Sequence, residues 1–226
     1  MSSQLWQDDP ASRDPFATQR KRMVAHQIER RGIHDPRVLE AMRLVPRHCF
    51  VPDRYHAAAY DDTPIAIGYG QTVSQPYIVA YMLQALKLVG IEKVLEIGAG
   101  SGYEAALLSH LCDEVYSIEI IPELAARAER ILKDLNYANV HIRCADGYKG
   151  WPEAGSFDRI ILSAAPTQVP EMLLEQLAPE GIMILPLGDL DQRLVHIKKN
   201  ANGEIERTHS LPVKFVPMTG IAASTN

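Results

Sequence analysis

The sequence lacks any apolar run approaching the length of about 20 residues that a membrane-spanning helix needs. Its N-terminus, MSSQLWQDDPASRDPF, has no apolar core of the kind found in secretory signals. Basic residues are outnumbered, with 23 Lys and Arg against 28 Asp and Glu, so the formal net charge is −5. Such a chain has no global attraction for nucleic acid or for an anionic membrane. We therefore predict a cytoplasmic protein that binds neither.

Cysteine is also scarce, and the three that occur, Cys49, Cys112 and Cys144, are isolated from one another. They form no C-x-x-C pair, and the eight scattered histidines add no metal-ligand spacing. This pattern favours reduced thiols, and it predicts neither a disulfide nor a metal site.

The composition is otherwise that of a globular chain: 46% of the 226 residues are hydrophobic, enough for a sizeable core. Residues 1–17 carry two Asp-Pro pairs and little apolar content, so we predict a flexible leader there. We expect residues 18–226 to form a single domain. Within it, helices and a substrate segment occupy 18–90, and a ligand-binding sheet with a C-terminal hairpin occupies 91–226.

Three helices are predicted in the N-terminal part. The first covers 18–31 and ends at a glycine, and the second covers 35–46 with Asp35 as its N-cap and proline at the first helical position. The third begins near residue 77, places Ile78, Met82, Leu86 and Val89 on one face and is expected to end at a glycine after Val89.

The rhythm then changes to short β-branched runs, KVLEIG, EVYSIEI, NVHIRC, FDRIILSAA and GIMILPL, separated by helical patterns. Alternating helices and nearly continuously apolar strands predict a doubly wound, Rossmann-like α/β fold whose mostly parallel sheet is covered on both faces. The pair Asn202-Gly203 stands between two alternating runs, which is a hairpin signal. The sheet is therefore expected to end in an antiparallel pair.

A glycine-rich loop in VLEIGAGSGYEAALLSHL follows the first of these strands and opens a helix. Gly98, Gly100 and Gly102 let the backbone turn tightly and approach a ligand. Tyr103 stands where a dinucleotide fingerprint requires glycine, and the chain has no phosphate-loop motif. The loop therefore suits an adenosine ligand without a pyrophosphate.

Three acids lie at the ends of neighbouring strands. Glu119 follows the loop by about 20 residues, where a carboxylate accepts both ribose hydroxyls. Asp146, with Gly147, ends the next strand and could accept from the adenine amine, while Glu96 precedes the loop and could bind an ammonium. Each acid alone could be a solvated strand-end charge. Together they predict S-adenosyl-L-methionine as the ligand.

The chain resembles the protein-L-isoaspartate (D-aspartate) O-methyltransferases from about residue 22 to about residue 219. The shared segments include RMVAHQI, VPRHCFVP, AYDDTPIAIGYGQTVSQPYIVAYM, VLEIGAGSGYEAALLSHL, DGYKGWPEAGSFDRIILSAAP, LAPEGIMILPLG and VKFVPMTG. The resemblance implies a seven-stranded sheet with the last strand antiparallel. It also implies methyl esterification of the free α-carboxyl of L-isoaspartyl, and possibly D-aspartyl, residues in damaged peptides and proteins, leaving S-adenosyl-L-homocysteine. We expect a monomer whose partners are these substrates.

The resemblance also assigns site residues. It implies that Ser74 is the active-site serine. The donor-binding residues that we predict from the loop and the resemblance together are Ser74, Gln75, Pro76, Tyr77, Glu96, Ile97, Gly98, Gly100, Gly102, Glu119, Ile120, Asp146, Gly147 and Thr219. Arg47 and Arg54 flank HCFVPD, and for both we expect a solvated position over a contact with a substrate carboxylate.

The segment GYGQTVSQPY, residues 68–77, offers hydroxyls, amides and phenols but no acid, base or thiol. A free α-carboxyl has a pKa of roughly 3.5, so it reaches the enzyme already ionised and needs no general base. Ser74 would then orient the carboxylate, with Thr72 and Gln75 shaping the loop; alternatively, Ser74 is only the N-cap of the following helix. A methyltransferase for a small-molecule acid and a non-catalytic adenosine-binding module remain alternatives.

Overall fold

The computed structural model describes residues 14–221, and the predicted leader before residue 14 lies outside the described residues. The end of that leader contacts the fold. The ring of Phe16 packs against His48 with centroids 4.4 Å apart, and Asp14 pairs with Arg20 at 2.7 Å. Fixed contacts therefore begin a few residues before the predicted boundary at residue 18.

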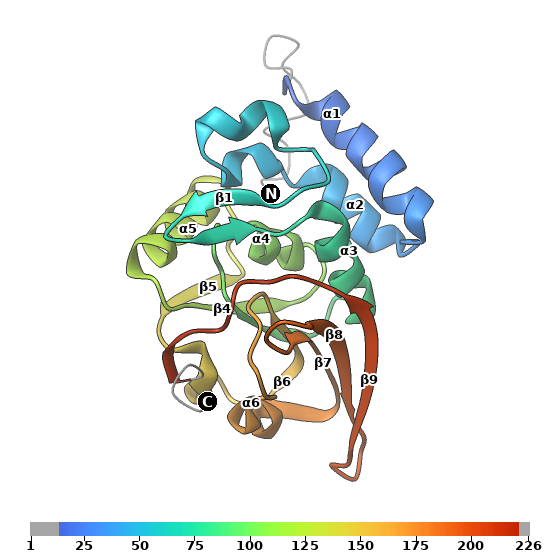
Figure 1. Cartoon of the computed structure of the whole chain (residues 1–226), viewed down its shortest axis with the longest axis vertical. Helices are drawn as coiled ribbons and strands as arrows, with labels where there is room; N and C mark the ends of the chain where they lie inside the picture. The colour runs from blue at the N-terminus through green and yellow to red at the C-terminus, as the bar shows by residue number, and fades with distance from the viewer. Residues whose placement is uncertain (1–13, 222–226) are drawn as a thin grey trace.

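A seven-stranded sheet in the order β5-β4-β3-β6-β7-β8-β9 forms the centre of the molecule (Figure 1). Its strands are β3 (Lys93–Ile97), β4 (Glu114–Glu119), β5 (Val140–Cys144), β6 (Phe157–Leu162), β7 (Leu177–Leu187), β8 (Arg193–Lys199) and β9 (Ile205–Pro212). The strands β3 to β7 pair in parallel, β8 is antiparallel to β7, and β9 is antiparallel to β8. The predicted α/β fold, seven strands and C-terminal hairpin are confirmed.

The first two predicted helices are confirmed. α1 (Ala17–Arg22) continues through a π-helical segment (Met23–Ile28) and a 3-10 turn (Glu29–Arg31), and ends at Gly32 with φ of 95°. α2 (Pro36–Leu44) is capped by Asp35, whose side chain accepts from the N–H groups of the first turn.

The third helix is shorter than predicted. α3 (Pro76–Ala85) ends before Val89, which is 67% exposed and does not share the buried face. The reason is a tight turn in which the Glu92 carboxylate accepts from the N–H groups of Val89, Gly90 and Ile91 at 2.8 to 3.1 Å. This side-chain cap replaces the last helical turn.

The remaining elements position the site. They are the hairpin β1 (Ile65–Gly68) and β2 (Gln71–Val73), the helices α4 (Tyr103–Ser109), α5 (Pro122–Asp134) and α6 (Glu171–Gln176), and the 3-10 turns Arg47–Phe50, Asp53–Ala58, Gly147–Lys149 and Pro152–Ala154. No described helix is both long and apolar enough to cross a membrane.

The core lies on both faces of the sheet, because alternate residues of each strand point to opposite sides. Val94 and Val115 pack with the N-terminal helices, α3, α4 and α5, whereas Leu95 and Ile118 pack with α6. The first of these clusters is continuous from Met23 to the sheet. The N-terminal segment is therefore part of the same core that supports the sheet.

Candidate active site

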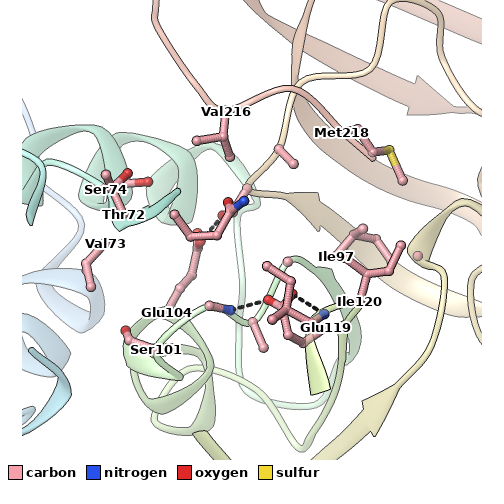
Figure 2. Close-up of a pocket in the computed structure, with 18 of the residues that line it drawn as sticks. Thr72, Val73, Ser74, Ile97, Ser101, Glu104, Glu119, Ile120, Val216 and Met218 are labelled. Atoms are coloured by element: carbon pink, nitrogen blue, oxygen red, sulfur yellow. Dashed lines mark hydrogen bonds between the residues drawn. The ribbon is translucent and has the colours of Figure 1, made fainter. Parts of the chain in front are cut away.

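Two adjoining pockets lie above the carboxyl ends of β3, β4 and β6. The first is bounded by the glycine loop, the end of β4, the β2–α3 segment and the chain near residue 217, and the second by the β2–α3 segment and residues 212–216. Both are lined by Thr72, Ser74, Ser163 and Val216. Figure 2 shows Ser74 and Thr72 facing the glycine loop across the first pocket.

The glycine loop forms the floor of the first pocket, as predicted from the sequence. Gly98 and Gly100 line it, and Gly100 donates its N–H to Glu119 Oε2 at 2.8 Å. Gly102 does not line the pocket; it has φ of 87°, and a Cβ there would lie 3.2 Å from Leu132 Cδ1 of α5. Its role is therefore the tight packing of the loop against α5.

Glu119 and Ile120 line the same pocket from the end of β4. The two Glu119 oxygens are fixed by the N–H groups of Gly100 and Ile121, at 2.8 and 2.9 Å (Figure 2). Each carboxylate oxygen retains a further lone pair, so the fixed carboxylate can still accept from a vicinal diol. This geometry fits the predicted ribose contact.

Glu96 does not line either pocket. Its side chain is fully buried on β3, where Oε2 accepts from Ser117 Oγ of β4 and Oε1 has no hydrogen-bond partner among the described residues. Burial raises the pKa of this carboxyl well above its usual value, and the charges of Glu104 and Glu119 raise it further. The predicted direct ammonium contact therefore lacks access.

Glu104 is a pocket residue that the sequence reasoning missed. It is the second residue of α4 and lines the first pocket. Its Oε2 accepts a hydrogen bond from Ser163 Oγ (Figure 2). Burial raises its pKa to about 7. The sequence did carry a signal, because this acid follows the glycine loop directly and is itself followed by the apolar run AALL. The structure buries every residue of the helix from Tyr103 to Leu108.

The end of β5 contributes less than predicted. Gly147 lines the first pocket, but the Asp146 carboxylate accepts from the N–H groups of Tyr148 and Ile221, at 2.9 and 2.8 Å, and is not a lining residue. The chain after β9 crosses toward this point (Figure 1), and Thr219 lines the pocket on the way. Ile97 also lines it, against Gly147.

Ser74 occupies the junction of the two pockets and is held through its backbone. Its carbonyl accepts from Arg47 Nη2 at 2.8 Å, and Arg47 Nε donates to Ala59 O at 2.8 Å. Arg47 is fully buried, with its guanidinium 4.7 Å from the ring centroid of Tyr103. The expectation that Arg47 is solvated is wrong: Nε and Nη2 donate to these backbone carbonyls beside the aromatic face, and Nη1 is buried without a hydrogen-bond partner among the described residues.

The alternative that Ser74 is merely the N-cap of the following helix is also wrong. Gln75 occupies the N-cap position of α3, and the N–H of Tyr77 is capped from a distance by Asp62 Oδ1 at 3.3 Å. Ser74 lies one residue before this capping position and lines both pockets.

The three residues after Ser74 brace the loop. Gln75 lines the second pocket and donates to Asp62 Oδ2 at 2.7 Å, while the ring of Tyr77 lies 3.6 Å below the Arg31 guanidinium. Pro76 is buried at the first position of α3. None of the three lines the first pocket, where the resemblance had placed them.

The second pocket contains no acid, histidine or cysteine among its described lining residues. These are Pro64, Thr72, Ser74, Gln75, Ile78, Ser163, Pro212, Val213, Lys214, Phe215 and Val216. Its one ionisable group is the exposed Lys214. The pocket therefore offers hydroxyls and an amide to a polar ligand, and no general base. Within residues 14–221, no group of three or more His, Cys, Asp or Glu is placed to hold a metal ion.

Comparisons with known proteins agree on one family. The sequence model described as protein-L-isoaspartate(D-aspartate) O-methyltransferase (PCMT) matches residues 18–223. A protein-L-isoaspartate O-methyltransferase of a Synechococcus species is 50% identical over 217 residues, covering 92% of this chain and 88% of the relative.

Solved structures give the same result. A Plasmodium falciparum structure, described as a putative protein-L-isoaspartate O-methyltransferase in complex with S-adenosyl-L-homocysteine, is 26% identical with a TM-score of 0.77, over 88% of this chain and 98% of that one. Another protein-L-isoaspartate O-methyltransferase structure is 28% identical with a TM-score of 0.79, over 89% of this chain and 66% of that one. The chain therefore belongs to the protein-L-isoaspartate(D-aspartate) O-methyltransferase family.

Proposed function

We propose that this enzyme transfers a methyl group from S-adenosyl-L-methionine, bound in the first pocket, to the free α-carboxylate of an isoaspartyl residue in the second pocket. Ser74 is the residue that orients this carboxylate. The observation that carries the proposal is the position of Ser74, which lines both pockets at their junction. Family membership supplies the reaction type, and the pocket geometry supplies the assignment of residues.

The residues of the first pocket fit the donor. S-adenosyl-L-methionine supplies the methyl group from its sulfonium, and S-adenosyl-L-homocysteine remains after the transfer. The Glu119 carboxylate, fixed by two backbone amides, accepts from the ribose hydroxyls. Gly98 and Gly100 permit close approach of the ligand to the loop. Glu104 also lines this pocket, and one of its oxygens has no hydrogen-bond partner among the described residues, which supports a contact with a cationic group.

The second pocket fits an acceptor that is already ionised. In an isoaspartyl residue the chain runs through the side-chain carboxyl, so the α-carboxyl is free, with a pKa of roughly 3.5. No base is needed to activate it, which agrees with a described lining that contains no acid, histidine or cysteine. The Ser74 hydroxyl donates a hydrogen bond that holds one carboxylate oxygen in place while the other faces the donor.

Alignment is the main contribution that such a site can make. Holding two reactants in line supplies on the order of 7 to 11 kcal/mol of the barrier in favourable cases. A cationic clamp would stabilise the ground-state carboxylate and lower its nucleophilicity, whereas a hydroxyl orients it with less of that penalty. Lys214 lines the second pocket too, but it is exposed, so solvent screens its charge.

The repair role follows from the product. A methyl ester is a better electrophile than a carboxylate, so the next backbone nitrogen attacks its carbonyl and closes a succinimide, while the C–OCH3 bond breaks and methanol leaves with the proton from that nitrogen. Hydrolysis of that ring yields some normal aspartate. We also propose that the enzyme acts as a cytoplasmic monomer, that residues 18–226 form one catalytic domain, and that D-aspartyl residues are a second class of substrate.

The test is transfer of radiolabelled methyl to matched peptides containing isoaspartate or aspartate at one position. Base-labile label on the isoaspartyl peptide alone is the expected result. Label on a small-molecule acid but on neither peptide would indicate the small-molecule alternative. Binding of S-adenosyl-L-homocysteine without transfer to any acceptor would indicate a non-catalytic module and overturn the proposal.

A further inference from the structure

Glu104 presents an unsatisfied acceptor inside the first pocket. Its side chain is 7% exposed, Oε2 is engaged by Ser163 Oγ, and Oε1 has no hydrogen-bond partner among the described residues. A buried oxygen of this kind is costly to leave unpaired. Figure 2 shows the Glu104 side chain rising from α4 among the residues that line the first pocket, so its unpaired oxygen belongs to a pocket-lining side chain.

The charges around Glu104 are of one sign. Glu96 lies beside it on β3 and Glu119 on β4, and the described lining of the first pocket contains no Lys, Arg or His. The nearest guanidinium named in the site, that of Arg47, is engaged by the Tyr103 ring and two backbone carbonyls. The pocket therefore gathers carboxylates without a matching cation of its own, so it is complementary to a cationic ligand.

We propose that Glu104 is a donor-binding residue whose carboxylate pairs with the ammonium at the amino-acid end of S-adenosyl-L-methionine. The inference rests on the proposed use of the first pocket by this donor. It transfers the ammonium contact from Glu96, which has no access to the pocket, to Glu104, which lines it. An ammonium has three donors and can satisfy the orphaned Oε1 while water is excluded.

Glu96 then has a supporting role. Its buried carboxyl shares the negative environment of Glu104 and is fixed by Ser117. Because two adjacent carboxyls ionise together only at a cost, the free enzyme holds protons here near neutral pH. A bound ammonium favours the ionised form of Glu104, so donor binding releases a proton. Affinity for ligands that carry the ammonium therefore rises as the pH increases from about 6 to about 8, through the Glu104 pKa of about 7.

The experiment is calorimetric titration of the wild-type enzyme and Glu104→Gln with S-adenosyl-L-homocysteine at pH 6, 7 and 8. A second ligand, 5′-methylthioadenosine, carries the adenosine and sulfur but no ammonium, and serves as the matched control. Repeating the titrations in buffers of different ionisation enthalpy measures the protons released. Glu92→Gln replaces another buried carboxyl, which caps the Val89–Ile91 turn away from both pockets, and serves as the control variant.

The expected result is a loss of S-adenosyl-L-homocysteine affinity on the order of tenfold at pH 8 in Glu104→Gln. The variant should also lose the proton release, bind 5′-methylthioadenosine like the wild type, and melt no lower than it. Equal loss for S-adenosyl-L-methionine is expected; loss for that ligand alone would assign Glu104 to the sulfonium and overturn the ammonium pairing.

Unchanged affinity and proton release in Glu104→Gln would overturn the inference, as would equal losses for both adenosine ligands, which indicate a purely structural role. Glu92→Gln is expected to bind S-adenosyl-L-homocysteine like the wild type. An enzyme that behaves as expected in these titrations but methylates no isoaspartyl peptide would overturn the proposed function and leave this inference standing.

Discussion

The two pockets that meet at Ser74 differ in the charge of the groups around them. Glu104 and Glu119 line the first, with Glu96 buried behind it, whereas the second has neutral hydrogen-bonding groups and one exposed lysine. The ligands that we propose for the two pockets also differ in charge. The donor, for the acidic first pocket, carries positive charge, and the acceptor, for the second pocket, is an anion. Under this proposal, charged side chains hold the donor, and neutral hydrogen-bonding groups align the acceptor.

The pockets also differ in how they are supported. The first is built on strand ends and on backbone amides that fix Glu119. The second depends on the segment after β2, which is held by the buried Arg47 beneath Ser74 and by Asp62 beneath Gln75. Changes in the two pockets should therefore separate kinetically, and the following predictions test that separation.

The largest effect is expected from Ser74→Ala. Removing the hydroxyl leaves the acceptor carboxylate unoriented, so kcat/KM for an isoaspartyl peptide should fall on the order of 100-fold. Affinity for S-adenosyl-L-homocysteine, measured by calorimetry, should change little. Thr72→Ala is the matched control, because it removes a neighbouring hydroxyl that also lines both pockets and is expected to cost much less. Unchanged peptide turnover in Ser74→Ala would contradict the role.

Glu119→Gln should give the converse pattern with a smaller effect. An amide offers one acceptor oxygen where the carboxylate offers two, so either the Gly100 or the Ile121 N–H loses its partner. We expect the donor KM to rise on the order of tenfold, with the peptide KM nearly unchanged. Steady-state kinetics with each substrate varied in turn checks this; a rise confined to the peptide KM would reverse the assignment of the pockets.

Glu104→Gln should stabilise the ligand-free enzyme in a pH-dependent way. The folded-state pKa of about 7 lies above the ordinary value of 4.5, so the folded protein binds the proton more tightly between these two pH values. The stability contributed by this group is therefore present below pH 4.5 and lost as the pH rises to 7. The variant should melt several degrees above the wild type at pH 8, by a difference that narrows toward pH 5. A difference independent of pH would contradict the raised pKa.

The smallest effect is expected when pH is varied and the rate of methyl transfer to the acceptor in the second pocket is measured. With donor and isoaspartyl peptide both saturating, kcat should vary by less than about twofold from pH 6 to 8.5, because the acceptor with its pKa of roughly 3.5 is ionised throughout. Rapid-quench measurement of the methyl-transfer step isolates this value from product release. A steep rise with a midpoint in this range would reveal a base that the neutral lining does not contain.

Much of this was predictable from the sequence because it depends on short segments. Asp35 before a proline predicts a helix start, and Asn202-Gly203 predicts a hairpin, since each constrains the backbone of its own neighbours. The glycine loop was identified for the same reason. The early end of α3 was not predicted, because it depends on the Glu92 carboxylate folding back onto three amides.

The candidate site was predicted in outline but not in every residue. Ser74, Glu119 and Thr219 line the first pocket as expected. Asp146 does not, because Ile221, 75 residues later in the chain, donates to its carboxylate. Contacts across such a separation leave no local pattern in the sequence, and the burial of Arg47 against Tyr103 is a further example.

The sequence by itself determined the strand–glycine loop–helix unit, the mostly parallel sheet and a neutral segment around Ser74, because local φ preferences and hydrophobic periodicity act over a few residues. Only the tertiary structure decided which acid lines the first pocket. Glu96 and Glu104 are both acids near the glycine loop, but Glu96 lies within β3 and Glu104 lies at the start of α4, on either side of that loop. Glu96 is completely buried and lines neither pocket, whereas Glu104 lines the first pocket and keeps one buried oxygen without a hydrogen-bond partner among the described residues.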